Sequence, residues 1–300
     1  MITILNPGVV FLDYGPISMT ISAWNKNIPL THQCVDASQV AIKHLQEISC
    51  NLKHLKKPWL LCEKDILTGA AFKMWQAAKS TGDTDLTPMA AVAGVMADRT
   101  ADWLMENGAT KVIVNNGGDI ALRLMNNEQA SVGIVPQLGR ASFSHKVLIK
   151  SSDHIGGIAT SGLGGRSFTR GIADSVTVFA KNCITADVFA TSLANSSYID
   201  CPGVKQAPAE TIDPNTDIPG IMITISVGPL NLTEKQKSLR QIEKKSQWIL
   251  ENNLITGAIA HVQGEKLEAP GKLLTKIKHL EVNNEYEIQE TCNCSGRSTR

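Results

Sequence analysis

The segment 157–195 limits the possible folds and ligands of this chain most, because it combines three chemically different structural elements within one short stretch. It reads GIATSGLGGRSFTRGIADSVTVFAKNCITADVFATSLAN, which is a glycine-rich turn with arginines, an apolar β-branched strand and a helix that bears an acid. Backbone N–H groups and guanidinium forks suit phosphate, and a helical carboxylate near a hydroxyl suits a hard cation. A phosphate site and a metal site so close together predict a nucleotide-type ligand.

The glycine-rich turn begins at Thr160, Ser161 and Gly162, and Arg166 and Arg170 follow it. It matches neither a Walker loop, which needs GK[ST], nor a GxGxxG fingerprint that opens a helix. A solvent-facing hairpin tip explains this composition as well as a phosphate site does. Both interpretations stay open on the residues alone.

Asp187 and Thr191 lie four residues apart and therefore share one face of the predicted helix. A buried carboxylate needs a partner, and a divalent cation held by Asp187, the Thr191 hydroxyl and a main-chain carbonyl would supply one. Magnesium would keep its other positions for water or ligand phosphate. The alternative is an acid near the start of its helix that is stabilised by the helix dipole.

A second glycine pair follows the β-branched strand expected at 111–114. Asn116, Gly117, Gly118 and Asp119 lead from that strand into another apolar segment, which predicts a hairpin with a primed turn. The functional interpretation is that the glycines let backbone lie against a planar ring or pyrophosphate. The two interpretations are compatible.

A helix is predicted from Pro88, with Thr87 as its N-cap and Gly108 as its stop. Small residues around Ala90 and Gly94 would let a ligand or another backbone approach closely, although tight helix-on-sheet packing explains them more simply. Hairpins and helices alternate along the rest of the chain. The segment 201–219, rich in proline and acids, is long enough to predict a functional flap.

Composition bounds the class of protein and its partners. The chain has 300 residues, 43% hydrophobic and 19% charged, with a net charge of +1, so neither nucleic acid nor an anionic membrane is an expected partner. No apolar run reaches the length of a membrane span. Seven cysteines without a framework spacing favour reduced thiols and a cytoplasmic setting. Cys292 and Cys294 fall in the segment 291–300, which is expected to be a flexible tail rather than a metal site.

Four blocks of sequence in this order resemble the ApbE family of flavin transferases: VNNGGDI at 114–120, ATSG at 159–162, SVTV at 175–178 and ADVFAT at 186–191. The chain is more closely similar to the UPF0280 branch of that superfamily through PMAAVAG at 88–94, GGRSF at 164–168 and DPNTDI at 213–218. The resemblance extends from about residue 9 to about residue 228.

The resemblance implies an ApbE-like α/β (α+β) fold, with mixed or antiparallel sheets and packed helices, in a single domain 1–290. It carries the family's magnesium ligands onto Asp187, Thr191 and a helix-start carbonyl near Ala90, with Asp187 as the catalytic residue. It places an FAD or FMN site at Asn116, Gly117, Gly118, Asp119, Thr160, Ser161 and Gly162. In such transferases FAD is cleaved at its pyrophosphate and FMN is placed on a threonine or serine of an acceptor protein.

The chain departs from the transferase pattern in two places. The HxxDPxTG block is missing between the TSG turn and the VTV strand, since His154 and Asp213-Pro214 lie elsewhere, and Ala93 replaces the lysine of GAxAKG. Three hypotheses follow: a magnesium-dependent flavin enzyme that also uses Arg166 and Arg170, a non-catalytic binding or accessory protein, or an enzyme on another small substrate in the same cleft. By analogy, exposed edge strands would allow a homodimer.

Overall fold

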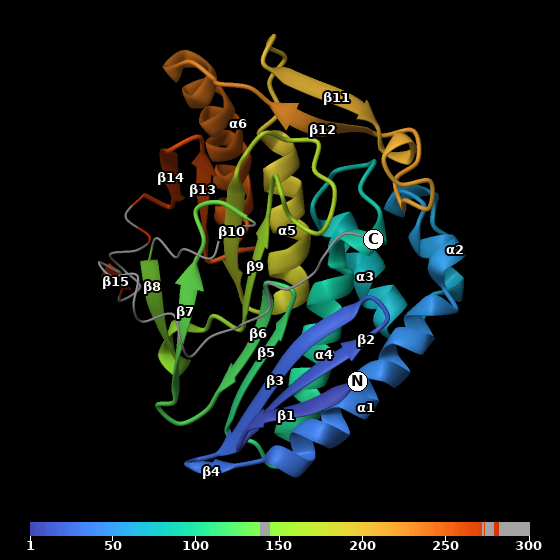
Figure 1. Ribbon diagram of the computed structural model, residues 1–300, viewed down its shortest axis with the longest axis vertical. Helices are drawn as coiled ribbons and strands as arrows, with labels where there is room; N and C mark the ends of the chain where they lie inside the picture. The colour runs from blue at the N-terminus through green and yellow to red at the C-terminus, as the bar shows by residue number, and fades with distance from the viewer. Residues whose placement is uncertain (139–144, 272, 274–278, 282–300) are drawn as a thin grey trace.

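The computed structural model describes residues 1–138, 145–271, 273 and 279–281, and its centre is a ten-stranded sheet (Figure 1). The strand order is β1-β2-β3-β5-β6-β9-β10-β13-β14, with β4 paired to β3, and the described pairings are antiparallel. These strands are β1 (Ile2–Asn6), β2 (Val9–Tyr14), β3 (Ile17–Asn25), β4 (Ile28–Pro29), β5 (Lys111–Asn116), β6 (Asp119–Leu124), β9 (Gly157–Ser161), β10 (Ser175–Ala180), β13 (Gly257–Val262) and β14 (Glu265–Ala269).

Two smaller sheets complete the described strands. β7 (Gln129–Ile134), β8 (His145–Lys150) and β15 (His279–Glu281) form a three-stranded sheet, and β11 (Val204–Pro208) and β12 (Met222–Val227) form a ribbon. All their pairings are antiparallel. The fold class expected from the sequence, helices packed with antiparallel sheets, is confirmed.

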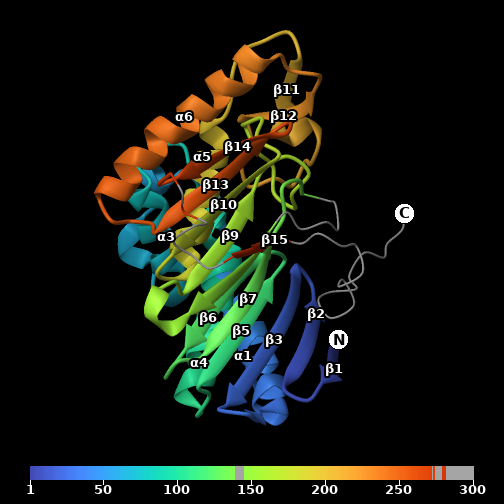
Figure 2. The ribbon, with the colours of Figure 1, turned by 90° about the vertical axis from the view of Figure 1, so that its left-hand side faces the viewer.

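The long helices lie on one side of the central sheet, as the two ribbon views agree (Figures 1 and 2). The helices are α1 (Thr31–Ser49), α2 (Leu52–Leu55), α3 (Gly69–Ser80), α4 (Val92–Glu106), α5 (Cys183–Ser196) and α6 (Leu232–Glu251). Short 3-10 turns lie between the helices and strands: η1 (Trp59–Leu61), η2 (Lys64–Ile66), η3 (Pro88–Ala91), η4 (Ser151–Asp153) and η5 (Ala209–Thr211).

Strand β10 is buried along its whole length because both faces of the sheet are covered there. Val176 and Val178 join the main core between sheet and helices, whereas Phe179 joins a second core beneath the three-stranded sheet. Successive side chains of a strand point to opposite faces, which separates these neighbours. Burial on both faces explains why the SVTVFA sequence is apolar without strict alternation.

The start of the helix predicted at Pro88 differs from the expectation. A 3-10 turn, η3, precedes α4, and Thr87 makes no side-chain cap. Thr87 does occupy the predicted N-cap position, but its hydroxyl donates to the Asp217 carboxylate at 3.3 Å instead of capping a helical N–H group. Pro88 does occupy the first helical position, and Gly108 follows the helix with a φ of 90°.

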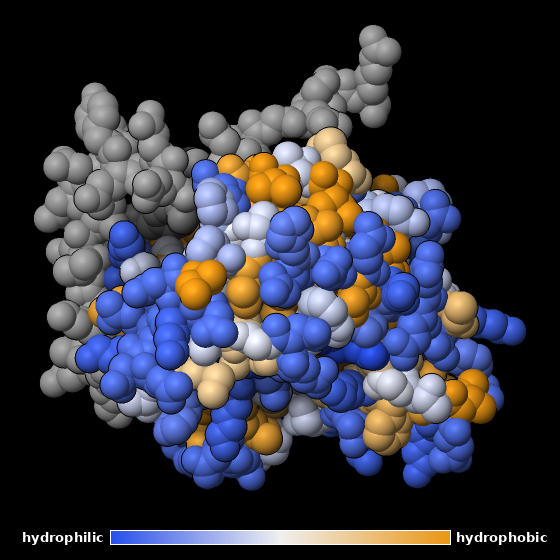
Figure 3. Space-filling model, turned by 90° about the horizontal axis from the view of Figure 1, so that it is seen from below, coloured by the Kyte–Doolittle hydropathy of each residue, from blue (hydrophilic) through white to orange (hydrophobic). Residues whose placement is uncertain are grey.

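Within the described residues no helix is long and apolar enough to cross a membrane. The lower face of the molecule is mainly hydrophilic, with small hydrophobic groups between charged ones (Figure 3), as is normal for protein surfaces. The predicted tail 291–300, with Cys292 and Cys294, lies outside the described residues.

Candidate functional site

Helices α4 and α5 meet near their N-termini, and the contact depends on Gly94. A Cβ atom at this position would lie 2.6 Å from the carbonyl oxygen of Cys183, so only glycine allows the two backbones to approach this closely. The small residues recognised in the sequence of this helix therefore serve helix packing at Gly94. The same contact places the exposed N–H groups of the first turn of α4 against α5.

Asp187 of α5 uses these N–H groups. Its Oδ2 accepts a hydrogen bond from the Gly94 N–H at 2.8 Å. Burial raises the pKa of Asp187 well above its usual range, the nearby negative charge of Asp119 raises it further, and the Gly94 N–H opposes the shift. Among the described residues, no lysine, arginine or histidine forms an ion pair with Asp187.

Asp98 of α4 has the reciprocal position. Its carboxylate accepts from the N–H groups of Cys183 and Ile184, at 3.0 and 2.8 Å, in the first turn of α5. Each helix thus supplies an acid that caps the other helix. Asp98, however, also pairs with Arg123 at 3.0 Å, whereas the carboxylate of Asp187 has no such cation. The crossing therefore contains one neutralised acid and one acid without a counter-charge.

Asp119, at the start of β6, brings a second carboxyl to the region of Asp187. Burial raises the pKa of Asp119 to about 7, opposed by a hydrogen bond from the Thr160 backbone and by the charge of Arg166. The neighbouring β5–β6 turn is tied to the helix because the Asn116 amide donates to the Ala93 carbonyl at 3.2 Å. The predicted hairpin is confirmed, with Gly117 and Gly118 at positive φ.

Two adjoining cavities meet at this carboxyl pair. An inner cavity of about 260 Å³ and an outer cavity of about 390 Å³ share Asp119, Asp187 and Thr191 in their walls. The inner cavity is also lined by the predicted residues Asn116, Gly117, Thr160, Ser161 and Gly162. Ala90 and Arg170 line the outer cavity, and Arg166 lines both. Gly118, at the exposed tip of the turn, lines neither.

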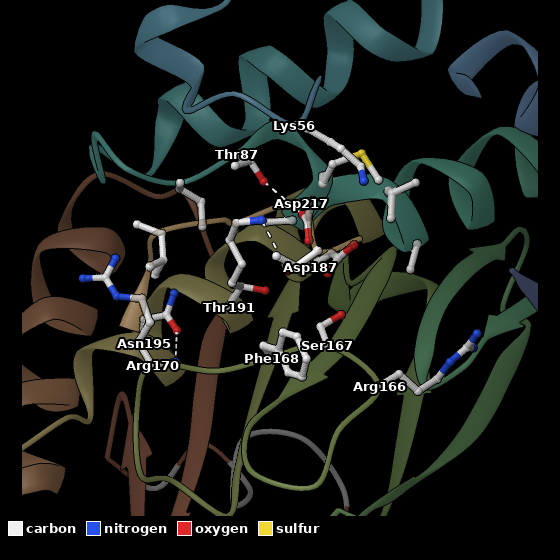
Figure 4. A pocket seen from close by; sticks show the side chains of 18 of the residues that line it. Lys56, Thr87, Arg166, Ser167, Phe168, Arg170, Asp187, Thr191, Asn195 and Asp217 are labelled. Carbon is white, nitrogen blue, oxygen red and sulfur yellow. Dashed lines mark hydrogen bonds between the residues drawn. The ribbon is translucent and has the colours of Figure 1, made fainter. Parts of the chain in front are cut away.

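The two predicted phosphate arginines are already engaged. Arg170 pairs with Asp85, and Arg166 donates to the Pro16 carbonyl at 2.9 Å. Figure 4 shows Asp187 and Thr191 in the wall of the outer cavity, with the Arg166 side chain directed away from them. A ligand phosphate near Arg170 would therefore compete with the Asp85 carboxylate.

The segment 201–219, in which a flap was predicted, contains β11 and the loop that leads to β12. That loop borders the outer cavity through Asp213 and Asp217, among others. Besides the bond between Thr87 and Asp217, the Lys56 ammonium donates to the Asn215 carbonyl at 2.8 Å and ties the loop to the end of α2. His154 lines neither cavity, so Asp213 reaches the cleft and His154 does not.

The donor set fits a hard cation. Carboxyl oxygens of Asp187 and Asp119, the Thr191 hydroxyl and main-chain carbonyls are the oxygen ligands that magnesium prefers. The described residues contain no cluster of three His, Cys, Asp or Glu that could hold a metal by itself. A cation here would thus need oxygens from water or from the ligand.

The family model described as AbpE bacteria matches residues 3–269. The chain belongs to this family. Among curated relatives it is 35% identical over 150 residues to a UPF0280 protein of Methanothermobacter thermautotrophicus, covering 49% of this chain and 58% of that protein. It is 38% identical over 138 residues to a UPF0280 protein of Methanococcoides burtonii, covering 45% and 56%. The chain thus spans about half the length of these relatives.

Solved structures give weak superpositions. The ApbE protein of Thermotoga maritima has a TM-score of 0.46 at 13% identity, covering 87% of this chain and 96% of that one. The flavin transferase ApbE of Vibrio cholerae has a TM-score of 0.33 at 15% identity, covering 82% and 77%. The resemblance to the UPF0280 branch of the ApbE-like superfamily is confirmed by the family match and the curated relatives.

Several residues of the cleft were not predicted from the family's sequence motifs. They lie outside the positions to which the resemblance assigned a ligand: Lys56, Asp85, Thr87, Asn195 and Asp217. Asp98 was also missed, because one aspartate inside an amphipathic helix does not reveal that it caps a different helix. The acidic, proline-rich composition of 201–219 did indicate the loop that borders the outer cavity.

Proposed function

We propose that this protein binds a phosphorylated ligand of the flavin-nucleotide class together with a divalent cation in the two adjoining cavities. The observation that carries the proposal is the difference between the reciprocal acids: Asp98 is neutralised by Arg123, and Asp187 faces the cleft without a counter-charge. Carboxylates removed from water are otherwise paired or bound to metal, so the cavity wall at Asp187 suits a cation.

Asp187, Thr191 and the Ala90 carbonyl would hold the cation, with Asp119 close by. A bound magnesium ion would neutralise phosphate charge and polarise a phosphoryl oxygen. The backbone at Gly117 and Gly162 leaves room for a flat ring in the inner cavity, while Arg170 can meet phosphate in the outer one. The flavin part of the proposal rests on the four sequence blocks, and the cation part rests on geometry.

The first candidate activity for this site is transfer of FMN to an acceptor hydroxyl. A non-catalytic binding protein is the second candidate, favoured by the missing HxxDPxTG block and by His154 lying outside both cavities. Release of AMP from FAD distinguishes the two candidates, because a binding protein leaves the pyrophosphate intact. The acceptor would then be sought among proteins that gain the mass of FMN.

Calorimetric titration of FAD tests the proposal, with and without magnesium, on the wild type, Asp187→Asn and Asp102→Asn. Asp102 lies outside both cavities and is the matched acid-to-amide control. We expect magnesium-dependent binding by the wild type and by the control, and its loss in Asp187→Asn. FAD binding that does not depend on magnesium, or that is unchanged in Asp187→Asn, would contradict the cation site. Absence of FAD binding both with and without magnesium would rule out a flavin nucleotide as the ligand.

A further inference from the structure

The reciprocal caps imply a link between the cation site and a part of the molecule that touches neither cavity. Asp98 is 6% exposed and lines neither cavity of the cleft, yet its carboxylate holds two consecutive N–H groups of α5. Asp187 lies one helical turn farther along the same helix. Any axial shift of α5 would therefore move Asp187 relative to Gly94.

Arg123 connects this cap to the central sheet. Its Nη1 donates to the carbonyls of Leu122 and Gly156 at 3.0 and 3.2 Å, while Nη2 binds Asp98. Arg123 belongs to β6, the strand that begins with Asp119. One strand thus carries Asp119 directly and fixes the position of α5 through Arg123 and Asp98.

We propose that Asp98 is a positioning residue for the cation site: with Arg123, it sets the axial position of α5 and thereby the place of Asp187 opposite Asp119. This inference rests on the proposed function, which assigns a cation to the site beside Asp187. It is independent of the ligand's identity, because Asp98 contacts backbone and Arg123. It adds to the site a residue that supplies no oxygen to the cation.

A matched pair of variants separates positioning from the general loss of an ion pair. Asp98 and Asp102 are both partners of Arg123 on α4, at 3.0 and 2.7 Å, but Asp98 also binds the first turn of α5. In Asp98→Asn an amide replaces one oxygen that accepts from α5. In Asp102→Asn those bonds to α5 remain intact.

Manganese binding, measured by electron paramagnetic resonance without any flavin, is the first readout. We expect Asp98→Asn to weaken Mn²⁺ affinity about tenfold, the lower end of the effect known for residues that support metal ligands. Asp102→Asn should stay within about twofold of the wild type, a change well below that range. Equal losses in the two variants, or unchanged affinity in Asp98→Asn, would overturn the positioning role.

The amide resonance of Gly94 is the second readout, and it requires no metal. Its N–H donates to Asp187, so its chemical shift and hydrogen-exchange rate report the place of that carboxylate. Asp98→Asn should change both quantities, as Asp187→Asn does, and Asp102→Asn should change neither. A Gly94 amide that does not respond to Asp98→Asn would contradict the inference, whatever the metal result.

The two readouts also distinguish this inference from the proposed function. If the wild type binds no Mn²⁺ but the Gly94 amide responds as expected, positioning is supported and the cation site is wrong. Should Asp98→Asn fold poorly because Arg123 keeps only Asp102 as an acidic partner, the double variant Asp98→Asn/Arg123→Gln removes the excess positive charge. It should show the same changes in Mn²⁺ affinity and in the Gly94 amide.

Discussion

Asp187 and Asp98 show how one residue type can have two roles at a single helix crossing. Both carboxylates cap the first turn of the opposite helix. Arg123 neutralises Asp98 inside the protein, whereas Asp187 opens to a cleft that also holds the carboxyl of Asp119. The charge around each acid, rather than its hydrogen bonds, therefore separates a structural residue from a candidate ligand.

Removing the charge of Asp187 should stabilise the metal-free protein. Asparagine keeps an oxygen for the Gly94 N–H and cannot ionise, whereas the raised pKa of Asp187 means that folding disfavours its ionised form, so the free energy of unfolding in alkaline solution should rise by about 1 kcal/mol in Asp187→Asn. Asp98→Asn should instead lower it by about 1–3 kcal/mol, since it disrupts satisfied bonds. Urea unfolding in EDTA measures both. If Asp187→Asn lowered the free energy of unfolding as much as Asp98→Asn does, Asp187 would serve only to cap α4.

The pH dependence of stability should reveal Asp119. Its pKa rises from 3.8 to about 7 in the folded protein, so folding favours the neutral form. The free energy of unfolding of the metal-free protein should therefore fall as the pH rises from about 4 to about 7. Magnesium should raise the melting temperature more at pH 8 than at pH 5, because protons compete with the cation. In Asp119→Asn both trends should weaken, and trends as strong as in the wild type would refute this assignment.

At the scale of elements, the contact between α4 and α5 depends on a single missing side chain. Gly94→Ala places a methyl group 2.6 Å from the Cys183 carbonyl and should cost about 1–3 kcal/mol of stability. Without that contact, alanine would stabilise a helix interior by about 0.5–1 kcal/mol. The sign of the change in unfolding free energy, measured in urea, decides whether the helices pack this closely.

The flap should open when its tie to α2 is cut. Lys56→Met keeps the aliphatic stem but removes the ammonium that donates to the Asn215 carbonyl. Hydrogen exchange of peptides covering 209–221 should accelerate, while exchange in β10 stays slow. Lys53→Met, an exposed lysine of the same helix, serves as control. Equal exchange in both variants would show that Lys56 does not hold the flap.

Local elements were predictable where local chemistry determines them. The β5–β6 hairpin follows from its glycine pair, and the helix that begins near Pro88 ends where Gly108 predicts its stop. Thr87 occupies the predicted N-cap position, but its hydroxyl donates to Asp217, which comes from a segment far along the chain, and makes no capping bond. The local sequence around a helix start cannot reveal a hydrogen-bond partner that only the tertiary fold brings near.

For the whole molecule, the sequence indicated a fold of hairpins and helices but not the order of the strands. The pairing of β6 with β9 and of β10 with β13 joins segments that no periodicity connects. The cleft residues likewise come from segments far apart in the chain, including the β5–β6 turn, the start of α4 and α5. The motifs therefore singled out Asp187 and Thr191, which line the cleft, while the positions of Lys56 and Asp85 beside them became visible only in the fold.

The central claim is that a divalent cation binds beside Asp187, and anomalous diffraction from crystals grown with MnCl₂ tests it most directly. We expect a manganese peak within coordination distance of the Asp187 carboxylate and the Thr191 hydroxyl. We also expect that the peak disappears in Asp187→Asn and persists in Asp102→Asn. A wild-type map without a peak there at saturating Mn²⁺, or a peak that survives in Asp187→Asn, would contradict the claim.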